Sequence, residues 1–272
     1  MPPLDVPSLV LRNTLLSADY NVLQFEAPAI AAASLPGQFV MIRTAAGTDP
    51  LLRRPFSVFE ILRDAAGSPS GISVLCKRIG PGTTRLYDAA AGDRLSVLGP
   101  LGKPFSPVSA PVEAWMVAGG VGLAPFATLT EAMQATGART RLFYGGRTRA
   151  DLFYLDWFAS RGVRLDLATE DGSLGARGRV TAPLDEALRA RPAGVPVTLY
   201  ACGPEPMLKA VAGLARTHGC PSQLSTERVM GCGLGGCYSC VVRVRDAGGT
   251  PRFVRSCLEG PVLRGEDVVW EP

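Results

Sequence analysis

Four cysteines in the C-terminal part of the sequence are the residues whose type and spacing most clearly suggest chemistry. They form the pattern C-x4-C-x2-C-x16-C, at Cys232, Cys237, Cys240 and Cys257. The spacing of the first three is that of plant-type [2Fe–2S] sites, and the glycines around them let a loop turn sharply with its N–H groups toward sulfur. Structural zinc sites usually join two separate short-spaced motifs, so zinc and unliganded thiols are the weaker alternatives. The sequence therefore predicts that these four cysteines hold a [2Fe–2S] cluster.

Other candidate nucleophiles and acids are few. Cys76 lies in a strand pattern, where a buried cysteine is a small apolar residue, and Cys220 falls in a turn and suggests a structural role. Cys202 ends a strand at the carboxyl edge, where α/β sheets bind ligands, so it is either structural or part of a nucleotide site. The single histidine, His218, suits the end of a helix. Without a second histidine, redox chemistry carried by cofactors is favoured over acid–base catalysis.

Two glycine-rich loops are candidate phosphate sites. The loop 119–122 separates a buried strand from a helical pattern, so its glycines allow a pyrophosphate to approach the N-terminus of a helix. The pattern is not GxGxxG, and a tight turn is the alternative. A second loop, 80–83, places Thr83 near a helix cap. Arg54 is a candidate diphosphate clamp and Ser57 a hydroxyl for a ring heteroatom, the alternative being a solvated arginine pair at 53–54.

Two kinds of element must position these residues. Up to residue 105, short apolar runs alternate with Gly, Pro or Asp, for example at 21–26, 37–42, 56–59, 72–75 and 94–98, which predicts a small antiparallel β-barrel. Beyond it, strand patterns at 115–118, 140–144, 163–168 and 197–202 alternate with helical patterns at 124–134, 152–160 and 205–217. That alternation predicts a parallel α/β sheet. The last fifty residues are too few to bury a large core, so we expect a metal-stapled appendage and the domain division 1–105, 106–222 and 223–272.

Composition limits the expected partners and the expected cellular compartment. The net charge is +4 and no run of Lys or Arg stands out, so neither nucleic acid nor an anionic membrane is an expected partner. No apolar stretch approaches 18 residues, and the first residues lack the basic and apolar regions of a signal peptide. We therefore expect a cytoplasmic protein, in which clustered cysteines indicate metal binding rather than disulfides.

Several motifs together resemble those of a known family. Arg-Pro-Phe-Ser (54–57), Gly-x-Gly-Thr (80–83), Gly-Pro-Leu-Gly (99–102), Gly-Gly-Val-Gly (119–122) and Cys-Gly-Pro (202–204) occur in the order seen in the ferredoxin–NADP reductase superfamily. The segments 230–240 and 257–262 make the chain similar to the electron-transfer subunits of NAD-linked dihydroorotate dehydrogenase B. The resemblance covers nearly the whole chain, and it implies an FAD-binding barrel, an NAD-binding α/β domain and a small cluster domain.

The resemblance also implies which residues bind each cofactor. The flavin end of FAD would be held by Arg54, Pro55, Phe56 and Ser57, and its ribose and diphosphate by Cys76, Lys77, Arg78, Gly82 and Thr83. NAD(H) would be held by Gly119, Gly120, Gly122, Cys202, Gly203 and Pro204. The family often has Tyr-Arg where this chain has Cys76-Lys77, and lysine is a poorer bidentate phosphate clamp than arginine.

The implied function is electron transfer between NAD and an FMN-containing dihydroorotate dehydrogenase catalytic subunit, through FAD and the cluster, in pyrimidine (UMP) biosynthesis. The two subunits are expected to form a heterotetramer with two copies of each. The alternatives are a subunit of an NAD(P)H-dependent ferredoxin, sulfide or hydrogenase oxidoreductase, an oxygenase reductase, and a non-enzymatic redox sensor. NADH is the expected nucleotide, although Arg147 and Arg149 follow a strand where related reductases hold the 2′-phosphate of NADPH.

Overall fold

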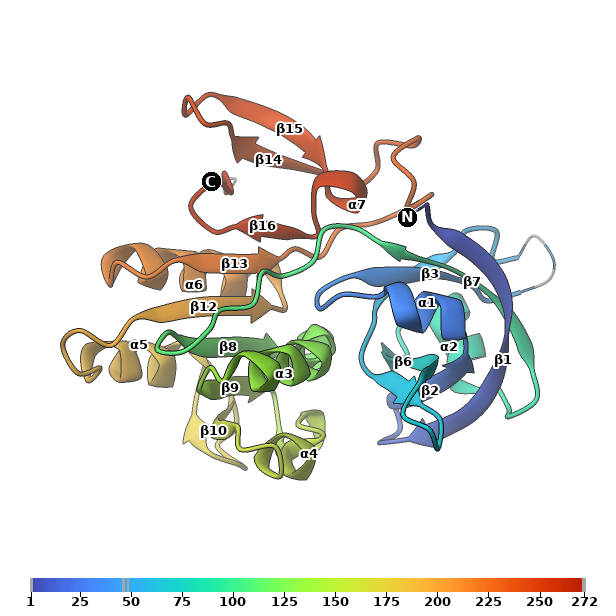
Figure 1. Cartoon of the computed structure of the whole chain (residues 1–272), viewed down its shortest axis with the longest axis horizontal. Helices are drawn as coiled ribbons and strands as arrows, with labels where there is room; N and C mark the ends of the chain where they lie inside the picture. Colours follow the sequence, from blue (N-terminus) through green and yellow to red (C-terminus); the bar gives the residue numbers. More distant parts are fainter. Residues whose placement is uncertain (1, 46, 48, 271–272) are drawn as a thin grey trace.

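The computed structural model describes residues 2–45, 47 and 49–270. Its first part is a curled antiparallel sheet with the strand order β4-β3-β7-β1-β2-β6-β5. The strands are β1 (Leu4–Leu15), β2 (Tyr20–Glu26), β3 (Phe39–Arg43), β4 (Arg54–Ser57), β5 (Ile61–Arg63), β6 (Pro69–Lys77) and β7 (Arg94–Leu101). Two short helices accompany them, α1 (Pro28–Ala33) and α2 (Pro81–Tyr87). The predicted antiparallel barrel is confirmed as an incomplete barrel, drawn at the right of Figure 1.

Alternation along β6 decides which side chains face the barrel interior. Successive side chains of a strand point to opposite faces, and Val74 and Cys76 lie in the barrel core. Leu75 instead joins the apolar core shared with the second part of the molecule. Lys77, two residues on, therefore projects on the same side as Leu75, away from the barrel interior.

The second part is a sheet with the order β11-β10-β9-β8-β12-β13-β16, parallel except for the β13–β16 pair. Its strands are β8 (Glu113–Gly119), β9 (Thr140–Gly146), β10 (Arg164–Thr169), β11 (Ala176–Arg177), β12 (Val197–Cys202), β13 (Ser222–Ser225) and β16 (Val262–Arg264). The helices are η1 (Gly120–Leu123), α3 (Pro125–Thr136), η2 (Arg149–Asp151), α4 (Leu155–Ala159), α5 (Thr181–Arg189) and α6 (Glu205–Thr217). Helices cover both faces (Figure 1), which is why β8 and β12 are nearly continuous apolar runs. The predicted parallel α/β sheet is confirmed.

The C-terminal segment is tied into this sheet. A hairpin of β14 (Val241–Arg245) and β15 (Pro251–Arg255) leads to α7 (Ser256–Glu259), and β16 then pairs antiparallel with β13. The expected boundary between residues 222 and 223 falls inside β13, which is hydrogen-bonded to β12. The segment is thus more than an appendage, because its last strand extends the α/β sheet, and the three-domain division stays a proposal.

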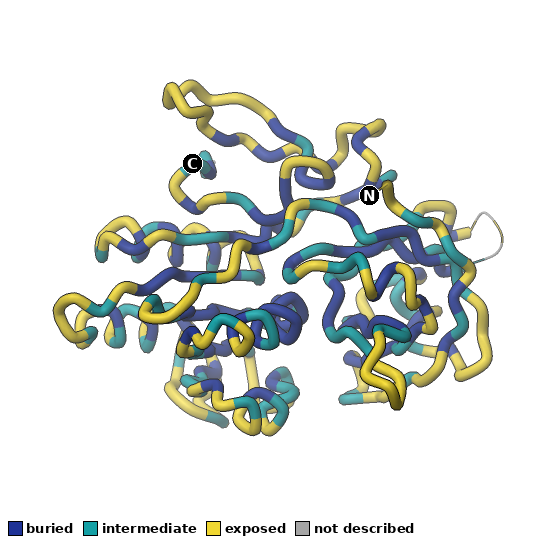
Figure 2. Tube along the Cα trace, in the orientation of Figure 1, coloured by how far each residue is buried: buried dark blue, intermediate teal, exposed yellow. Residues whose placement is uncertain are grey.

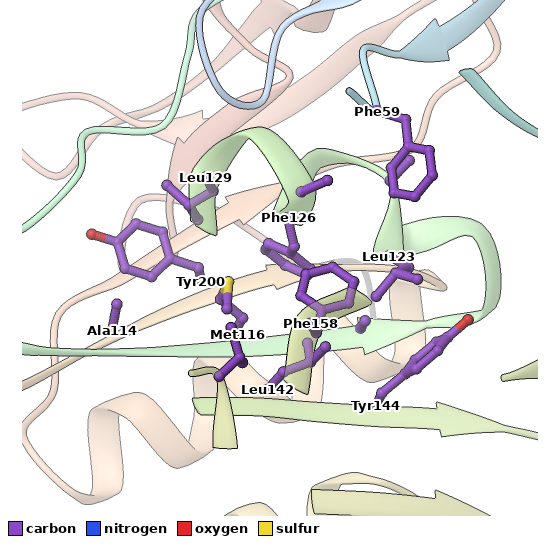
Figure 3. Packing of buried hydrophobic residues seen from close by; sticks show 14 of the residues in the cluster. Phe59, Ala114, Met116, Leu123, Phe126, Leu129, Leu142, Tyr144, Phe158 and Tyr200 are labelled. Atoms are coloured by element: carbon purple, nitrogen blue, oxygen red, sulfur yellow. The ribbon is translucent and has the colours of Figure 1, made fainter. Parts of the chain in front are cut away.

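A shared apolar core joins the barrel to the α/β sheet. Figure 3 shows Phe59 of the barrel beside Leu123 and Phe126 of the α/β part. The Phe59 ring also packs edge-on against Tyr154, with 4.7 Å between centroids. Burial of this aromatic surface fixes the two parts relative to each other, since apolar burial is worth about 25 cal/mol per Å². No helix in the described part of the chain is long and apolar enough to cross a membrane.

Candidate functional site

One large cavity lies where the barrel, the α/β sheet and the C-terminal segment meet. Its volume is 1420 Å³, above the range of about 300–1,000 Å³ that is usual for small-ligand pockets. Twelve of the fifteen residues expected to bind FAD or NAD(H) line it. They are Arg54, Pro55, Phe56, Ser57, Lys77, Thr83, Gly119, Gly120, Gly122, Cys202, Gly203 and Pro204. Residues predicted from separate motifs are therefore brought to one cavity.

Three of the expected residues do not line this cavity. The Cys76 side chain points into the barrel core, where burial raises its pKa to about 12. Arg78 stacks its guanidinium 4.7 Å from the centre of the Tyr87 ring and pairs with Asp19. Gly82 is buried beneath Arg54, and a Cβ there would lie 3.1 Å from the Arg54 Nε. Strand alternation and local pairing direct the Cys76 and Arg78 side chains away from the cavity, so any contact of Cys76, Arg78 or Gly82 with FAD would come from the backbone and stays a proposal.

On the barrel side, Arg54 stands at the first residue of β4. One Nη donates to the carbonyl of Leu52 at 2.6 Å, which fixes the guanidinium at the cavity wall. The Thr83 hydroxyl accepts the N–H groups of Ile79 and Gly80 at 2.9 and 3.0 Å. That contact shapes the start of α2, so Thr83 organises the loop as well as lining the cavity.

On the α/β side, the loops after β8 and β12 touch each other. A Cβ on Gly122 would lie 2.1 Å from the carbonyl oxygen of Cys202, so only glycine permits this approach. The two loops follow adjacent parallel strands at the carboxyl edge of the sheet, which is where open α/β sheets bind ligands.

Cys202 lines the cavity as an uncharged thiol. Burial raises its pKa to about 12, while a hydrogen bond with Ser225 acts in the opposite direction. Ser225 and Glu227 also line the cavity, and neither was singled out from the sequence. The available signal was their position at and just after the end of β13, the strand beside β12.

Tyr20 and Asp151 connect the barrel to the α/β part across the cavity. The Tyr20 hydroxyl donates to the Asp151 carboxylate at 3.3 Å, and its ring lies 4.8 Å from that of Phe153. Tyr144 donates to the carbonyls of Asp151 and Gly120 at 3.1 and 3.3 Å. Through Asp151 and Tyr144, the Tyr20 hydroxyl thus connects the barrel to the loop 119–122. No local pattern in the sequence indicates this chain of hydrogen bonds.

The four predicted cluster ligands lie in two pairs. Cys237 hydrogen-bonds with Cys232, and Cys257 with Cys240. Among the described residues, no group of three or more His, Cys, Asp or Glu side chains is placed to hold a metal ion. A zinc site needs its ligands around one ion, whereas a binuclear cluster shares four cysteines between two irons. The paired arrangement fits a [2Fe–2S] cluster better than zinc.

The two pairs differ in their surroundings. Cys240 and Cys257 are each 2% exposed and pack with Met41 of the barrel, and burial is the main cause that raises the pKa of Cys257 to about 12. Cys237 is exposed, and hydrogen bonds from Ser239 are the main cause that lowers its pKa to about 6, which favours the thiolate that metals bind. The Leu234 N–H donates to the Cys232 sulfur at 3.4 Å. One pair therefore faces the barrel and the other faces the surface.

The cluster loop rests on the strand beside the predicted flavin residues. Gly233 has φ +73°, and a Cβ there would lie 2.6 Å from Met41 Cγ. Met41 is paired with Pro55 across β3 and β4. Only one strand therefore separates the cluster loop from the segment 54–57.

Comparison with known proteins supplies the family. Residues 227–269 match the iron–sulfur cluster binding domain of dihydroorotate dehydrogenase B, and residues 116–213 match the oxidoreductase NAD-binding domain. The chain is 33% identical to the dihydroorotate dehydrogenase B (NAD(+)) electron transfer subunit of Desulforamulus reducens, over 96% of this chain and 97% of that one. The chain belongs to the family of dihydroorotate dehydrogenase B electron transfer subunits. The family member from Geobacillus kaustophilus is 39% identical over 86% of each chain.

Solved structures place this family member among related oxidoreductases. A chain of an NADH-dependent reduced ferredoxin–NADP oxidoreductase, studied for flavin-based electron bifurcation, has a TM-score of 0.83 and 28% identity, covering 97% of this chain and 90% of that one. A ferredoxin–NADP⁺ reductase of Neisseria gonorrhoeae with bound FAD and NADP has a TM-score of 0.63 at 18% identity, covering 79% and 92%, and this likeness shows the fold alone. The chain therefore has an oxidoreductase fold with an NAD-binding domain and an iron–sulfur binding domain.

Proposed function

We propose that this chain transfers electrons between NAD and a partner FMN-containing dihydroorotate dehydrogenase, through FAD and a [2Fe–2S] cluster, in pyrimidine (UMP) biosynthesis. The observation that carries the proposal is that flavin, nicotinamide and cluster residues surround one cavity in a family member. Bound FAD would supply the step between two-electron hydride chemistry and one-electron transfer. The chain's own residues bind, orient and shield the cofactors.

Each wall of the cavity has a separate task. Arg54 would clamp the FAD diphosphate with a charge-assisted hydrogen bond, and the Ser57 hydroxyl would orient the flavin ring. The loops 119–122 and 202–204 would hold NAD(H) with its nicotinamide toward the segment 54–57. The apolar walls exclude water from the place of hydride transfer, and the neutral Cys202 thiol adds no charge there.

Electrons would leave through the surface pair Cys232 and Cys237. Near them, Leu234 is 52% exposed and Tyr238 is 63% exposed. Because more than half of each side chain is exposed, we propose that both face the partner. No (β/α)8 barrel that could carry FMN occurs among the described residues, so the partner would supply it, in a cytoplasmic complex with two copies of each chain.

Glu170 supports NADH as the nucleotide. It follows β10 and lines the cavity together with Arg147. A carboxylate at this edge of a sheet suits the free ribose hydroxyls of NADH and repels a 2′-phosphate, while an arginine attracts one. The Arg149 side chain does not line the cavity, so one of the two arginines that would favour NADPH is displaced. We propose that NADH is preferred.

Reconstitution with the partner tests the proposal. The chain loaded with FAD and iron–sulfur should reduce dyes with NADH but should not oxidise dihydroorotate. Adding an FMN-containing dihydroorotate dehydrogenase subunit should yield a stable complex that forms orotate with NAD⁺. Dihydroorotate turnover by the isolated chain would overturn the proposed division of labour.

A ferredoxin-linked oxidoreductase is the second candidate, favoured by the TM-score of 0.83 to an NADH-dependent ferredoxin–NADP oxidoreductase. The same reconstitution separates the two. Binding to a ferredoxin-linked flavoprotein, together with no binding to the dihydroorotate dehydrogenase subunit, would move the assignment to this candidate.

A further inference from the structure

One face of the β14–β15 hairpin is an exposed surface that, apart from Val241, lies outside the cavity. Val241 lies opposite Arg255, and Arg243 opposite Phe253, and residues directly opposite on antiparallel strands share a face. On the other face, the valines 242, 244 and 254 are buried against the α/β part. Exposed and buried positions alternate along β14, whereas β15 is exposed up to Phe253, as Figure 2 shows at the top of the molecule. The outer side, here called the hairpin face, consists of Val241, Arg243, Arg245, Phe253 and Arg255.

Exposed apolar side chains gather around this face. Twelve large hydrophobic residues are exposed among the described residues, and five of them lie between 234 and 258. Those five are Leu234, Tyr238, Val241, Phe253 and Leu258. Phe253 is the most exposed of the five, at 68%. Exposed apolar clusters of this kind mark interaction sites more often than isolated exposed residues do.

The hairpin face is also positively charged. The two strands read VVRVR and PRFVR, without Asp or Glu, and three of their four arginines lie on this face, at 243, 245 and 255. Arg252 is neutralised by Glu259 at 2.9 Å, but Arg243 and Arg245 form no ion pair within the described part of the chain. The surface therefore attracts negative charge over a range of about 8–10 Å at physiological salt.

Arg255 connects the hairpin face to the cluster loop. Its guanidinium donates to the Gly235 carbonyl at 2.8 Å and lies 4.9 Å from the centre of the Tyr238 ring. The exposed aromatics Tyr238 and Phe253 thus belong to one surface that begins beside the exposed Cys237. A protein that covers this surface would come close to the electron exit.

We propose that the hairpin face is a docking surface for the FMN-containing catalytic subunit, whose matching surface is acidic with an apolar recess for Phe253. The inference rests on the proposed function and extends the contact beyond the cluster loop. Interface centres are enriched in aromatic residues and arginine, and opposite charges on the two partners speed and orient their encounter.

Binding measurements on the cofactor-loaded chain test this surface. We would compare the parent, R243A/R245A and F253A for binding to the FMN-containing dihydroorotate dehydrogenase subunit at low and high salt. The double variant should bind about tenfold more weakly at low salt and show a flatter salt dependence, and F253A should lose about tenfold at both. The control R139A/R164A removes the same charge from arginine side chains that are 88% and 71% exposed near β9 and β10, and it should bind like the parent.

Dye reduction by NADH should be unchanged in every variant, because none of these residues lines the cavity; this readout also confirms folding. Hairpin variants that bind with the parent's affinity and salt dependence would overturn the docking proposal alone. A parent chain that does not bind the subunit would remove the proposed function and the docking proposal with it.

Discussion

Arg54 is the residue on which flavin binding should depend most directly. It lines the cavity at the start of β4, and Arg54→Ala removes charge-assisted hydrogen bonds to a diphosphate worth about 1.5–3 kcal/mol. FAD affinity should fall by roughly tenfold to a hundredfold, measured by titrating the apoprotein with FAD. Arg53→Ala is the matched control, because Arg53 pairs with Asp5 at 2.7 Å outside the cavity. An Arg54→Ala protein that keeps the parent's FAD affinity would show that Arg54 has no such role.

Cys237 tests the cluster independently of the flavin. Cys237→Ser removes the exposed one of the four predicted ligands, so the visible iron–sulfur absorption and the roughly two irons per chain expected of a [2Fe–2S] centre should be lost. Flavin should stay bound, since its predicted ligands lie in the barrel. Cys220→Ser is the control, because Cys220 lies outside the cluster, with its sulfur accepting from Arg191. Finding one zinc and no acid-labile sulfide in the parent would refute the cluster assignment.

Local chemistry explains which site residues could be found from the sequence. The cysteine spacing and the glycine loops are constraints within a few residues, so Cys237 and Gly122 are recognisable without a fold. Tyr20 and Glu227 reach the cavity only through long-range packing. The side on which Cys76 lies depends on the pleat of β6, and a motif alone does not reveal it.

At the scale of elements, strands and helices with clear periodicity were predictable and those defined by their partners were not. The predicted bounds 197–202 and 205–217 agree with β12 and α6, because Gly203-Pro204 separates a buried strand from an amphipathic helix. The predicted strand 56–59 lies at 54–57, and the helix predicted over 152–160 spans only 155–159. The pairing of β16 with β13 joins segments whose order in the sheet depends on the folded cluster loop.

The contact between α3 and the barrel should make stability depend on pH. Burial is the main cause that raises the pKa of Glu131 on α3, while the charges of Arg161 and Arg63 act in the opposite direction. Burial likewise raises the pKa of Glu60 in the barrel part, and the charge of Glu131 raises it further, whereas Arg161 and hydrogen bonds act against this. Folded Glu131 therefore binds its proton more tightly than the unfolded chain does, and stability falls as pH rises from about 4.5 through the raised pKa.

Glu131→Gln removes this charge, so its unfolding free energy should decline less than the parent's between pH 4.5 and 8, as measured by urea denaturation. Glu186→Gln, at an exposed position on α5, is the control and should follow the parent. If the unfolding free energies of Glu131→Gln and the parent change with pH in parallel, Glu131 does not cause the pH dependence of stability.

At the scale of the whole molecule, the proposed route enters through the α/β part, crosses the barrel and leaves through the C-terminal segment. The last step, from the flavin to the cluster, depends on Gly233. Its φ is +73°, and it lies so close to Met41 that a Cβ there would be 2.6 Å from Met41 Cγ. In Gly233→Ala, the added Cβ should push the cluster loop away from β3. The left-handed backbone alone should destabilise the loop by about 1–2 kcal/mol. The cavity walls of the barrel and of the α/β part, where NADH reduces the flavin, are left in place.

Rapid mixing with NADH should then separate the two steps. Flavin reduction should keep the parent's rate in Gly233→Ala, while the following reduction of the cluster should slow, because the loop lies farther from the segment 54–57. Gly236→Ala is the matched control in the same loop, since a Cβ there has no neighbour within 4 Å and the backbone is not left-handed; both of its steps should match the parent. Equal rates of cluster reduction in the two variants would mean that electrons do not cross at the Gly233–Met41 contact. A slower flavin reduction in Gly233→Ala would mean that the substitution acts at the site of NADH oxidation instead.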